Sequence, residues 1–253
     1  MVEIIKSDNL GKLVYTNDGS ASLIHPDFEQ AYHSMNGAKK EAQDLYISSS
    51  GFLDELESFH TTKRNISVLD VGLGLGYNAL TTVEAWMESS SPRNLTVVSL
   101  ESNRELFQSM RTGEALWQSN WPSAWLSEVR SFGEASPSQW GATLKHPKQD
   151  CVCTWVVLLG DACQNPIIPQ GFKLSTTYDY IWQDPFSPEM NPNMWSKQWF
   201  SRMMEVSNPQ TKLMTYSVSR PVKDALKDSG WFYSLIETTT SKRSWLQATS
   251  HRS

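Results

Sequence analysis

The chain has 253 residues, with 22 lysines and arginines against 27 aspartates and glutamates, and a formal net charge of −5. Its apolar content of 39% with 13 glycines is that of a globular protein of one large or two small domains, which excludes disordered, collagen-like and disulfide-rich classes. No run approaches the ~18 apolar residues of a membrane span. The first ten residues lack the apolar core of a secretory signal, and three cysteines fit a reducing cytoplasm. The acidic excess argues against a broadly cationic surface that wraps nucleic acid.

The first 60 residues predict a hairpin followed by helices. Strands are expected at residues 12–16 and 20–24, because Asp18-Gly19 between them supplies the positive φ of a tight turn. Helices are expected at residues 37–47 and 52–60. We expect residues 1–60 to form an extension packed on a core domain that spans residues 61–253.

The rest of the chain alternates between strand and helix patterns. Strands are predicted at residues 66–71, 95–100, 151–159, 178–182, 212–217, 232–236 and 245–248, and helices at 78–87, 104–117, 196–206 and 222–227. Such alternation predicts an α/β, Rossmann-like fold, with a mostly parallel seven-stranded sheet and helices on both faces. Residues 121–150, rich in Pro, Ser and Trp, are interpreted as a loop-rich insertion.

A glycine-rich turn joins the first core strand to its helix. Gly72 and Gly74 allow a ligand to approach the backbone, and Gly76 allows the helix to start close to the strand. The spacing is G-x-G-x-G, which differs from the dinucleotide pattern G-x-G-x-x-G. Together with Asp70 before it and Asn78 after it, this spacing favours a nucleoside that carries an amino-acid tail. The alternative is a tight structural turn.

Two acidic residues follow other strands at their carboxyl ends. Glu101 can accept hydrogen bonds from both ribose hydroxyls, as acids do in doubly wound nucleotide sites. Asp161 can accept a hydrogen bond from the exocyclic amine of adenine. The alternatives are a solvated loop glutamate and an ordinary Gly-Asp turn.

A stiff loop follows the strand at residues 178–182. Its prolines at 185, 188 and 192 fix φ, and parallel sheets keep their chemistry at this edge. Asp184 can hold an amine and stabilise the cation formed on alkylation, while Phe186 can form a wall or stack on a base. The alternative is a turn that packs Trp195 into the core.

With these segments in view, the chain resembles class I S-adenosylmethionine-dependent methyltransferases, and more narrowly the methyltransferase domain of the MnmC family, which modifies the tRNA wobble uridine. The resemblance lies in residues 16–23, 29–34, 37–38, 70–78, 160–162, 184–195 and 215–217. It implies that the glycine turn and Glu101 hold S-adenosylmethionine and that Asp161 holds its adenine. It also implies that Asp184 faces the aminomethyl group, in a pocket that Tyr32 and Phe186 line.

The leading hypothesis is an N-methyltransferase acting on the 5-aminomethyl group of a tRNA wobble (2-thio)uridine, in the cytoplasm. A separate oxidase protein is a candidate partner, because no flavin-dependent domain is expected within the 253 residues. The alternatives are a methyltransferase for a protein or small-molecule amine, and a non-catalytic nucleotide-binding domain. No metal site is expected, since Cys151 and Cys153 lack further ligands at metal-binding spacing.

Two further predictions concern individual side chains. His33 is a weaker candidate for a general base and is more typical of a structural histidine. The basic residues at 39–40, 63–64, 145–148 and 242–243 would form a tRNA-binding patch only if they converged around the Asp184 cleft.

Overall fold

The computed structural model describes residues 10–58, 65–90, 93–172, 174, 177–237 and 244–250. Its helices are α1 (Ala38–Glu41), a π-helix (Ala42–Ser48), α2 (Phe52–Glu57), α3 (Tyr77–Glu88), α4 (Arg104–Thr112), α5 (Ser123–Arg130), α6 (Lys197–Glu205) and α7 (Arg220–Asp228), with 3-10 turns at Leu116–Gln118 and Pro192–Trp195. No helix in this part of the chain is both long and apolar enough to cross a membrane.

The described strands form a hairpin and one large sheet. The hairpin joins β1 (Lys12–Tyr15) to β2 (Ala21–Ile24), as predicted. The sheet has nine strands in the order β10-β11-β9-β8-β3-β4-β7-β6-β5. Their bounds are β3 (Asn65–Val71), β4 (Asn94–Glu101), β5 (Gly133–Ser136), β6 (Gln139–Lys145), β7 (Val152–Leu159), β8 (Tyr178–Gln183), β9 (Ser207–Thr215), β10 (Phe232–Glu237) and β11 (Ser244–Thr249).

The predicted parallel arrangement is confirmed for the centre of the sheet. The pairs β9-β8, β8-β3, β3-β4 and β4-β7 are parallel, and antiparallel pairs flank them on both sides. The prediction of seven strands was wrong, because the supposed insertion at residues 121–150 contains α5, β5 and β6. In β6, Trp140, Ala142 and Leu144 are buried at every second position. This period of two is a strand signal that the Pro, Ser and Trp composition of the segment concealed.

Three predicted helices differ in detail from those observed. The helix expected at residues 104–117 ends at Thr112, because Gly113 adopts φ +68° and stops it in the left-handed conformation. The helix expected at residues 37–47 is a single α turn that widens into the π-helix. α2 ends at Glu57, and residues 59–60 of its prediction lie outside the described residues.

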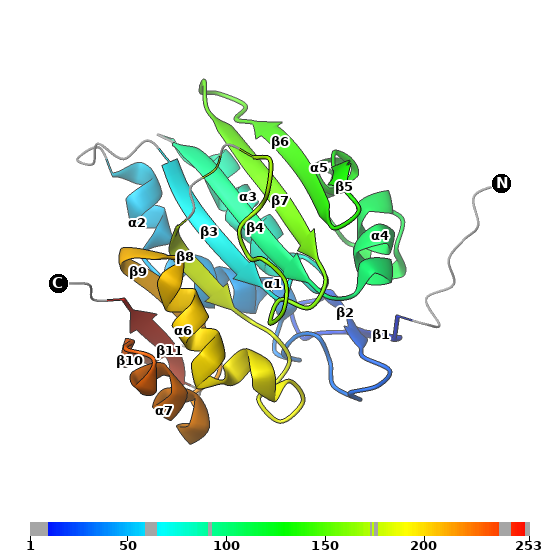
Figure 1. Cartoon of the computed structure of the whole chain (residues 1–253). Helices are drawn as coiled ribbons and strands as arrows, with labels where there is room; N and C mark the ends of the chain where they lie inside the picture. The colour runs from blue at the N-terminus through cyan, green and yellow to red at the C-terminus, as the bar shows by residue number, and fades with distance from the viewer. Residues whose placement is uncertain are drawn as a thin grey trace.

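Alternating side chains of the buried strands build one core on each face of the sheet. Ile66 and Val68 of β3 pack with α3, α4 and α5, whereas Leu69 and Val71 pack with α6 and α7. Figure 1 shows these helices in separate layers on the two sides of the sheet. Leu23 of β2 is fully buried in the same cluster as Val68. The boundary between extension and core near residue 60 stays a prediction.

The strand order fixes where a ligand can bind. From β3 the chain adds β4 and β7 on one side, and it then returns to place β8 on the other side of β3. In open parallel sheets such a reversal leaves a crevice outside the carboxyl ends of the central strands. In Figure 1 the ends of β3, β4 and β7 point toward the β1–β2 hairpin.

Candidate active site

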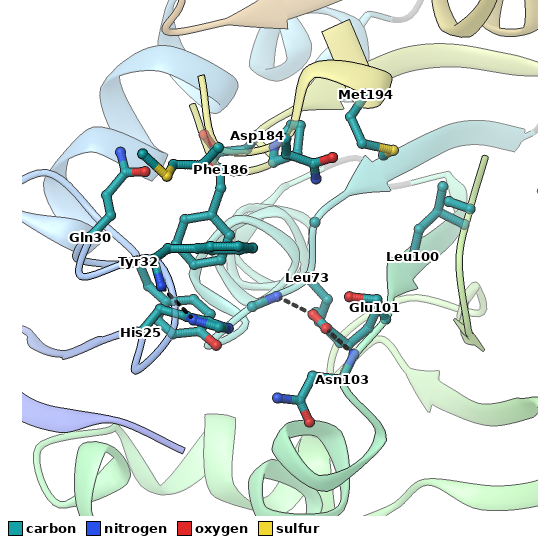
Figure 2. Close-up of a pocket in the computed structure, with 18 of the residues that line it drawn as sticks. His25, Gln30, Tyr32, Leu73, Leu100, Glu101, Asn103, Asp184, Phe186 and Met194 are labelled. Carbon is teal, nitrogen blue, oxygen red and sulfur yellow. Dashed lines mark hydrogen bonds between the residues drawn. The ribbon is translucent and has the colours of Figure 1, made fainter. Parts of the chain in front are cut away.

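A cavity of about 720 Å³ lies at the carboxyl ends of the central strands. This volume is in the range of pockets that hold small ligands and cofactors. The loops after β3, β4, β7 and β8 supply most of its wall, and residues 25–34 after the hairpin supply much of the remainder. Figure 2 shows side chains from these distant segments pointing into one space.

Most of the side chains that the sequence predicted for the site lie in this wall. The predicted residues that line the cavity are Tyr32, Gly72, Gly74, Asn78, Glu101, Asp161, Asp184 and Phe186. Asp70 and Gly76 do not line it. Gly76 instead begins α3 at φ +88°, where a Cβ would lie 3.0 Å from Sδ of Met110. Gly76 therefore allows the start of α3 to pack closely against Met110.

Gly72 is where two loops of the site touch. Its φ is +86°, and a Cβ there would lie 3.0 Å from the carbonyl oxygen of Asp184 and 3.2 Å from Cα of Pro185. The Asp184 amide donates to the carbonyl of Val71 at 3.0 Å, and the Gly72 amide donates to that of Leu100 at 3.2 Å. The glycine turn, the end of β4 and the Asp184 loop are therefore held backbone against backbone.

Glu101 is buried at the end of β4 and fixed by backbone donors. One carboxylate oxygen accepts from the Gly74 amide at 2.8 Å and the other from the Asn103 amide at 2.7 Å. Burial raises its pKa to about 7, and these donors oppose the shift. Each carboxylate oxygen has a second lone pair, so Glu101 retains acceptor capacity toward the cavity. Figure 2 shows both hydrogen bonds.

Asp70 lies behind the turn, in the interior of β3. It is fully buried, and neither carboxylate oxygen has a hydrogen-bond donor at bonding geometry among the described residues. Burial raises its pKa to about 7, Glu101 adds to this shift, and the hydroxyl of Ser99 on the paired strand opposes it. Asp70 thus lies behind the turn and is not part of the cavity wall.

Asp161 stands at the end of β7, where its carboxylate organises a turn. One oxygen accepts from the Cys163 amide at 2.9 Å, and the other accepts from Nε2 of Gln164 at 2.8 Å. Both Asp161 and Cys163 line the cavity. Asp161 therefore matches the turn interpretation as well as the predicted position in the wall.

Asp184 begins the loop after β8 and faces the cavity. Its Oδ2 accepts from Nδ2 of Asn78 at 2.7 Å. Burial raises the pKa of Asp184 to about 8, and the charge of Glu41 raises it further, while hydrogen bonds from Asn78 and Tyr46 oppose both effects. This carboxylate is held in one orientation and lacks a basic partner in the described wall.

Four aromatic rings close one side of the cavity. Phe186 packs edge-on against Phe28 and Tyr32, with ring centroids 4.9 Å apart in each case, and against His25 at 5.2 Å. His25 stacks on Phe28 at 4.4 Å. Only Tyr32 and Phe186 were predicted here. The aromatic residues at positions 25, 28 and 32 were the available sequence signal for the others.

His33 also lines the cavity but behaves as a structural residue. Its Nδ1 lies 3.1 Å from Oγ of Ser22, and its ring packs edge-on against Tyr77. Burial lowers its pKa to about 4, so the imidazole is neutral near pH 7. Glu41 and Tyr216 are wall residues that the sequence analysis missed. The hydroxyl of Tyr216 donates to the Pro185 carbonyl at 3.0 Å and thereby braces the Asp184 loop.

The basic residues do not gather on the described cavity wall, which contains no lysine or arginine. Lys145 ends β6 opposite Val152, the first residue of β7, so it lies at the far edge of the sheet. Lys39 and Lys40 pair with Glu84 and Asp44. The pairs at 63–64 and 242–243 lie outside the described residues. Within the described chain no group of three or more His, Cys, Asp or Glu side chains is arranged to hold a metal.

Substituting Gly72 tests the loop contact. We expect Gly72→Ala to lower the free energy of unfolding more than Gly230→Ala, as measured by urea denaturation. Gly230 has φ +87° and open space around its Cβ position, so its alanine variant carries only the left-handed backbone cost of about 1–2 kcal/mol. Gly72→Ala adds the clash with the Asp184 loop, roughly 1–3 kcal/mol. Equal losses in the two variants would contradict the close contact.

Replacing Asp70 by Asn tests the buried carboxyl. Because the pKa of Asp70 is raised from 3.8 to about 7, the folded state keeps a proton that the unfolded chain releases between these two pH values. Stability is therefore fully present below pH 4 and falls as the pH rises through about 7. We expect Asp70→Asn to lose less stability than wild type between pH 5 and pH 8 by urea denaturation. An unchanged slope would contradict this assignment; Asp224→Asn, at an exposed ion pair, is the control.

Comparisons with known proteins match this chain to methyltransferases. A family model described as S-adenosyl-L-methionine-dependent methyltransferase matches residues 128–251. The tRNA 5-methylaminomethyl-2-thiouridine biosynthesis bifunctional protein MnmC of Burkholderia mallei (strain SAVP1) is 26% identical over 238 residues, covering 92% of this chain and 34% of the relative. The same-named protein of Burkholderia pseudomallei (strain K96243) is 24% identical over 239 residues, with the same coverages.

Among solved structures, MNMC2 from Aquifex aeolicus matches with a TM-score of 0.67 and 22% identity, covering 94% of this chain and 70% of that one. This match confirms the Rossmann-like fold. The chain spans about a third of the length of the curated relatives that it matches. The chain is thus similar in sequence to the MnmC relatives over most of its own length, and its fold is like that of MNMC2.

Proposed function

We propose that the protein is an S-adenosylmethionine-dependent N-methyltransferase that methylates the 5-aminomethyl group of the tRNA wobble (2-thio)uridine. The observation that carries this proposal is the position of Asp184. Its carboxylate lies in the same cavity as the glycine turn, is oriented by Asn78, and is joined to the turn through the Gly72 contact. The MnmC relatives are named for tRNA 5-methylaminomethyl-2-thiouridine biosynthesis, and this supports the choice of tRNA.

The cavity fits the methyl donor. Its volume of about 720 Å³ is sufficient, and Glu101 offers fixed acceptors to ribose hydroxyls. We assign the backbone at Gly72 and Gly74 to the donor's amino-acid portion, and Asp161 to the adenine amine. Asp70 and Gly76 support this site from behind by shaping the turn and the start of α3. When bound, S-adenosylmethionine supplies a methyl group on a positively charged sulfur.

The remaining residues of the site position the acceptor. Asp184 accepts a hydrogen bond from the amine, directs the nitrogen lone pair toward the donor, and balances the charge that develops on nitrogen. Methyl transfer is an in-line displacement, so alignment can contribute up to ~7–11 kcal/mol. Phe186 and Tyr32 exclude water from one side and offer ring surfaces to a base, a common mode of single-stranded RNA recognition.

The tRNA backbone must be bound elsewhere than in the cavity. The described wall has no lysine or arginine, and the chain carries a net charge of −5. We propose that phosphate contacts come from basic residues outside the cavity wall. We further propose that the protein acts in the cytoplasm, and that a separate oxidase protein supplies the aminomethyl substrate. Net charge alone equally suits a protein or small-molecule amine as the acceptor.

Asp184→Asn tests the catalytic assignment. We expect methyl transfer from labelled donor to undermodified tRNA to fall by about 10²–10³-fold, the usual cost of losing one electrostatic contact to the transition state. Donor affinity by calorimetry should stay near wild type, because Glu101 and the glycine turn are unchanged. Asp224→Asn on the surface helix α7 is the matched control. Near-normal turnover of Asp184→Asn would remove Asp184 from the mechanism.

The salt dependence of binding tests the substrate class. If tRNA is the substrate, its affinity should fall steeply between 50 and 200 mM salt, because each phosphate contact releases a counterion. This is measured by fluorescence anisotropy with labelled tRNA. A flat dependence or no binding would favour a protein or small-molecule amine. If calorimetry detected no binding of S-adenosylmethionine, both enzyme assignments would fail and a non-catalytic nucleotide-binding domain would remain.

A further inference from the structure

The segment between the hairpin and α1 contributes a carboxamide, that of Gln30, to the cavity wall. Figure 2 shows Gln30 on the same side of the cavity as Tyr32 and Phe186, away from Glu101. Its Oε1 atom is buried and receives no hydrogen bond from the described residues. A buried acceptor without a donor lacks the hydrogen bond that water gives it in the unfolded chain. Gln30 is therefore a candidate for contact with a ligand on the side that we assign to the methyl acceptor.

Gln30 differs from the other carboxamides of the cavity. The described wall contains five of them: Gln30, Asn78, Asn103, Asn191 and Asn193. Asn78 donates to Asp184 through Nδ2, and Asn103 accepts from the Leu106 amide through Oδ1. These two side chains are already engaged in holding the site together. Of the remaining three, only Gln30 has a buried side-chain oxygen that no described donor reaches.

The backbone around Gln30 is fixed by hydrogen bonds. The carbonyl of Gln30 accepts from the His25 amide at 2.9 Å, and Ala31 forms an antiparallel bridge with Ile24 of β2. Glu29 has φ +48°, a conformation that non-glycine residues keep only where surrounding contacts hold them. The Gln30 side chain therefore starts from a defined position. The last torsion of a glutamine is broad, so its carboxamide can turn to meet the edge of a ligand.

A carboxamide matches one edge of a uracil base. That edge presents the O4 acceptor and the N3–H donor side by side. The carboxamide presents an N–H donor and a C=O acceptor side by side, so the two groups can form a pair of hydrogen bonds. Ionised acids of the wall can only accept, so they cannot donate to O4. Aromatic rings that stack on the face of a base leave this edge free for hydrogen bonding.

We propose, on the basis of the proposed function, that Gln30 is a specificity-determining residue that recognises the O4 and N3–H edge of the uracil base. Its Oε1 accepts from N3–H, and its Nε2 donates to O4. Phe186 and Tyr32 hold the plane of the base, and Asp184 faces the substituent on C5. Because C5 is bonded to C4, the aminomethyl arm and O4 lie next to each other, and one base can reach Asp184 and Gln30 together.

Methylation of N3 isolates this contact. A base with a methyl group on N3 keeps O4 and the aminomethyl arm but has no donor for Oε1. A site built around a hydrogen bond rejects an analogue that leaves its polar group unpaired. The bulk of the methyl group is the same for every variant of similar size at position 30. A change in the affinity ratio between variants therefore reports the hydrogen bond and not the bulk.

Binding of an RNA stem-loop tests the recognition of the base. The loop carries either 5-aminomethyluridine or its N3-methyl derivative, and fluorescence anisotropy measures both affinities with the full chain saturated with S-adenosylhomocysteine. We expect the ratio of the two affinities to be at least about tenfold smaller in Gln30→Met, whose side chain has similar length but neither N–H nor C=O. Gln30→Glu should keep most of the wild-type ratio, because its carboxylate still accepts from N3–H.

The matched control is Gln198→Met, which changes an exposed glutamine of α6 that is absent from the cavity wall. This variant should keep the wild-type ratio. Normal binding of S-adenosylhomocysteine by each variant shows that it is folded. Equal affinities of wild type for the two RNAs, or an unchanged ratio in Gln30→Met, would overturn the recognition of the base by Gln30. A ratio that falls equally in Gln30→Glu would overturn it as well, because Oε1 would then not be the acceptor.

Methyl transfer measured with the same RNAs separates this inference from the proposed function. A preference for the unmethylated N3 that Gln30→Met abolishes, without methyl transfer to either RNA, would overturn the proposed function and support the role of Gln30. Methyl transfer by wild type, with an affinity ratio that does not depend on Gln30, would overturn the role of Gln30 and support the proposed function.

Discussion

The site depends on one close contact between two backbones, where the Asp184 loop crosses the glycine turn at Gly72. A Cβ at this position would lie 3.0 Å from the carbonyl oxygen of Asp184, so with its φ of +86° any other residue would strain the turn and push the two loops apart. The contact joins β3 to β8, the strands on either side of the sheet's reversal. It thereby fixes the distance between the segment assigned to the donor and the carboxylate assigned to the acceptor. For an in-line displacement, that distance is the main quantity that the protein must control.

A second constraint follows from burial. The two-sided sheet takes Asp70 and Glu101 out of water, and the loop packing does the same for Asp184. Each carboxyl then holds its proton to a higher pH than usual, because burial disfavours the charged form. Carboxyl groups with such raised pKa values are typical of functional sites. Ligands that bring positive charge relieve it, so binding and stability are linked through the same few groups.

The sequence predicted those parts of the site in which the signal is local. Gly72 and Asp184 directly follow a strand and Glu101 ends one, and the carboxyl ends of parallel strands meet at one edge. Glu41 and Phe28 carry no such signal, because the first is one acid among others in a helical pattern and the second is an aromatic residue in a connecting segment. Their roles arise from contacts across the chain, such as the 4.9 Å packing of Phe28 on Phe186. The strand β6 was missed because the Pro, Ser and Trp content of residues 121–150 suggested a loop, although buried residues alternate along the strand.

The net charge of −5 acquires a different meaning once the acids are located. Five of the chain's acidic residues line the cavity, where they oppose phosphate and favour cations. An RNA substrate can then present only a base and its aminomethyl arm to this space, with its phosphates outside. The aromatic rings around Phe186 suit the base, and the carboxylates suit the arm. Under the proposed function, the cavity would separate the two chemistries of such a substrate, because the acidic charge that repels phosphates also favours an amine.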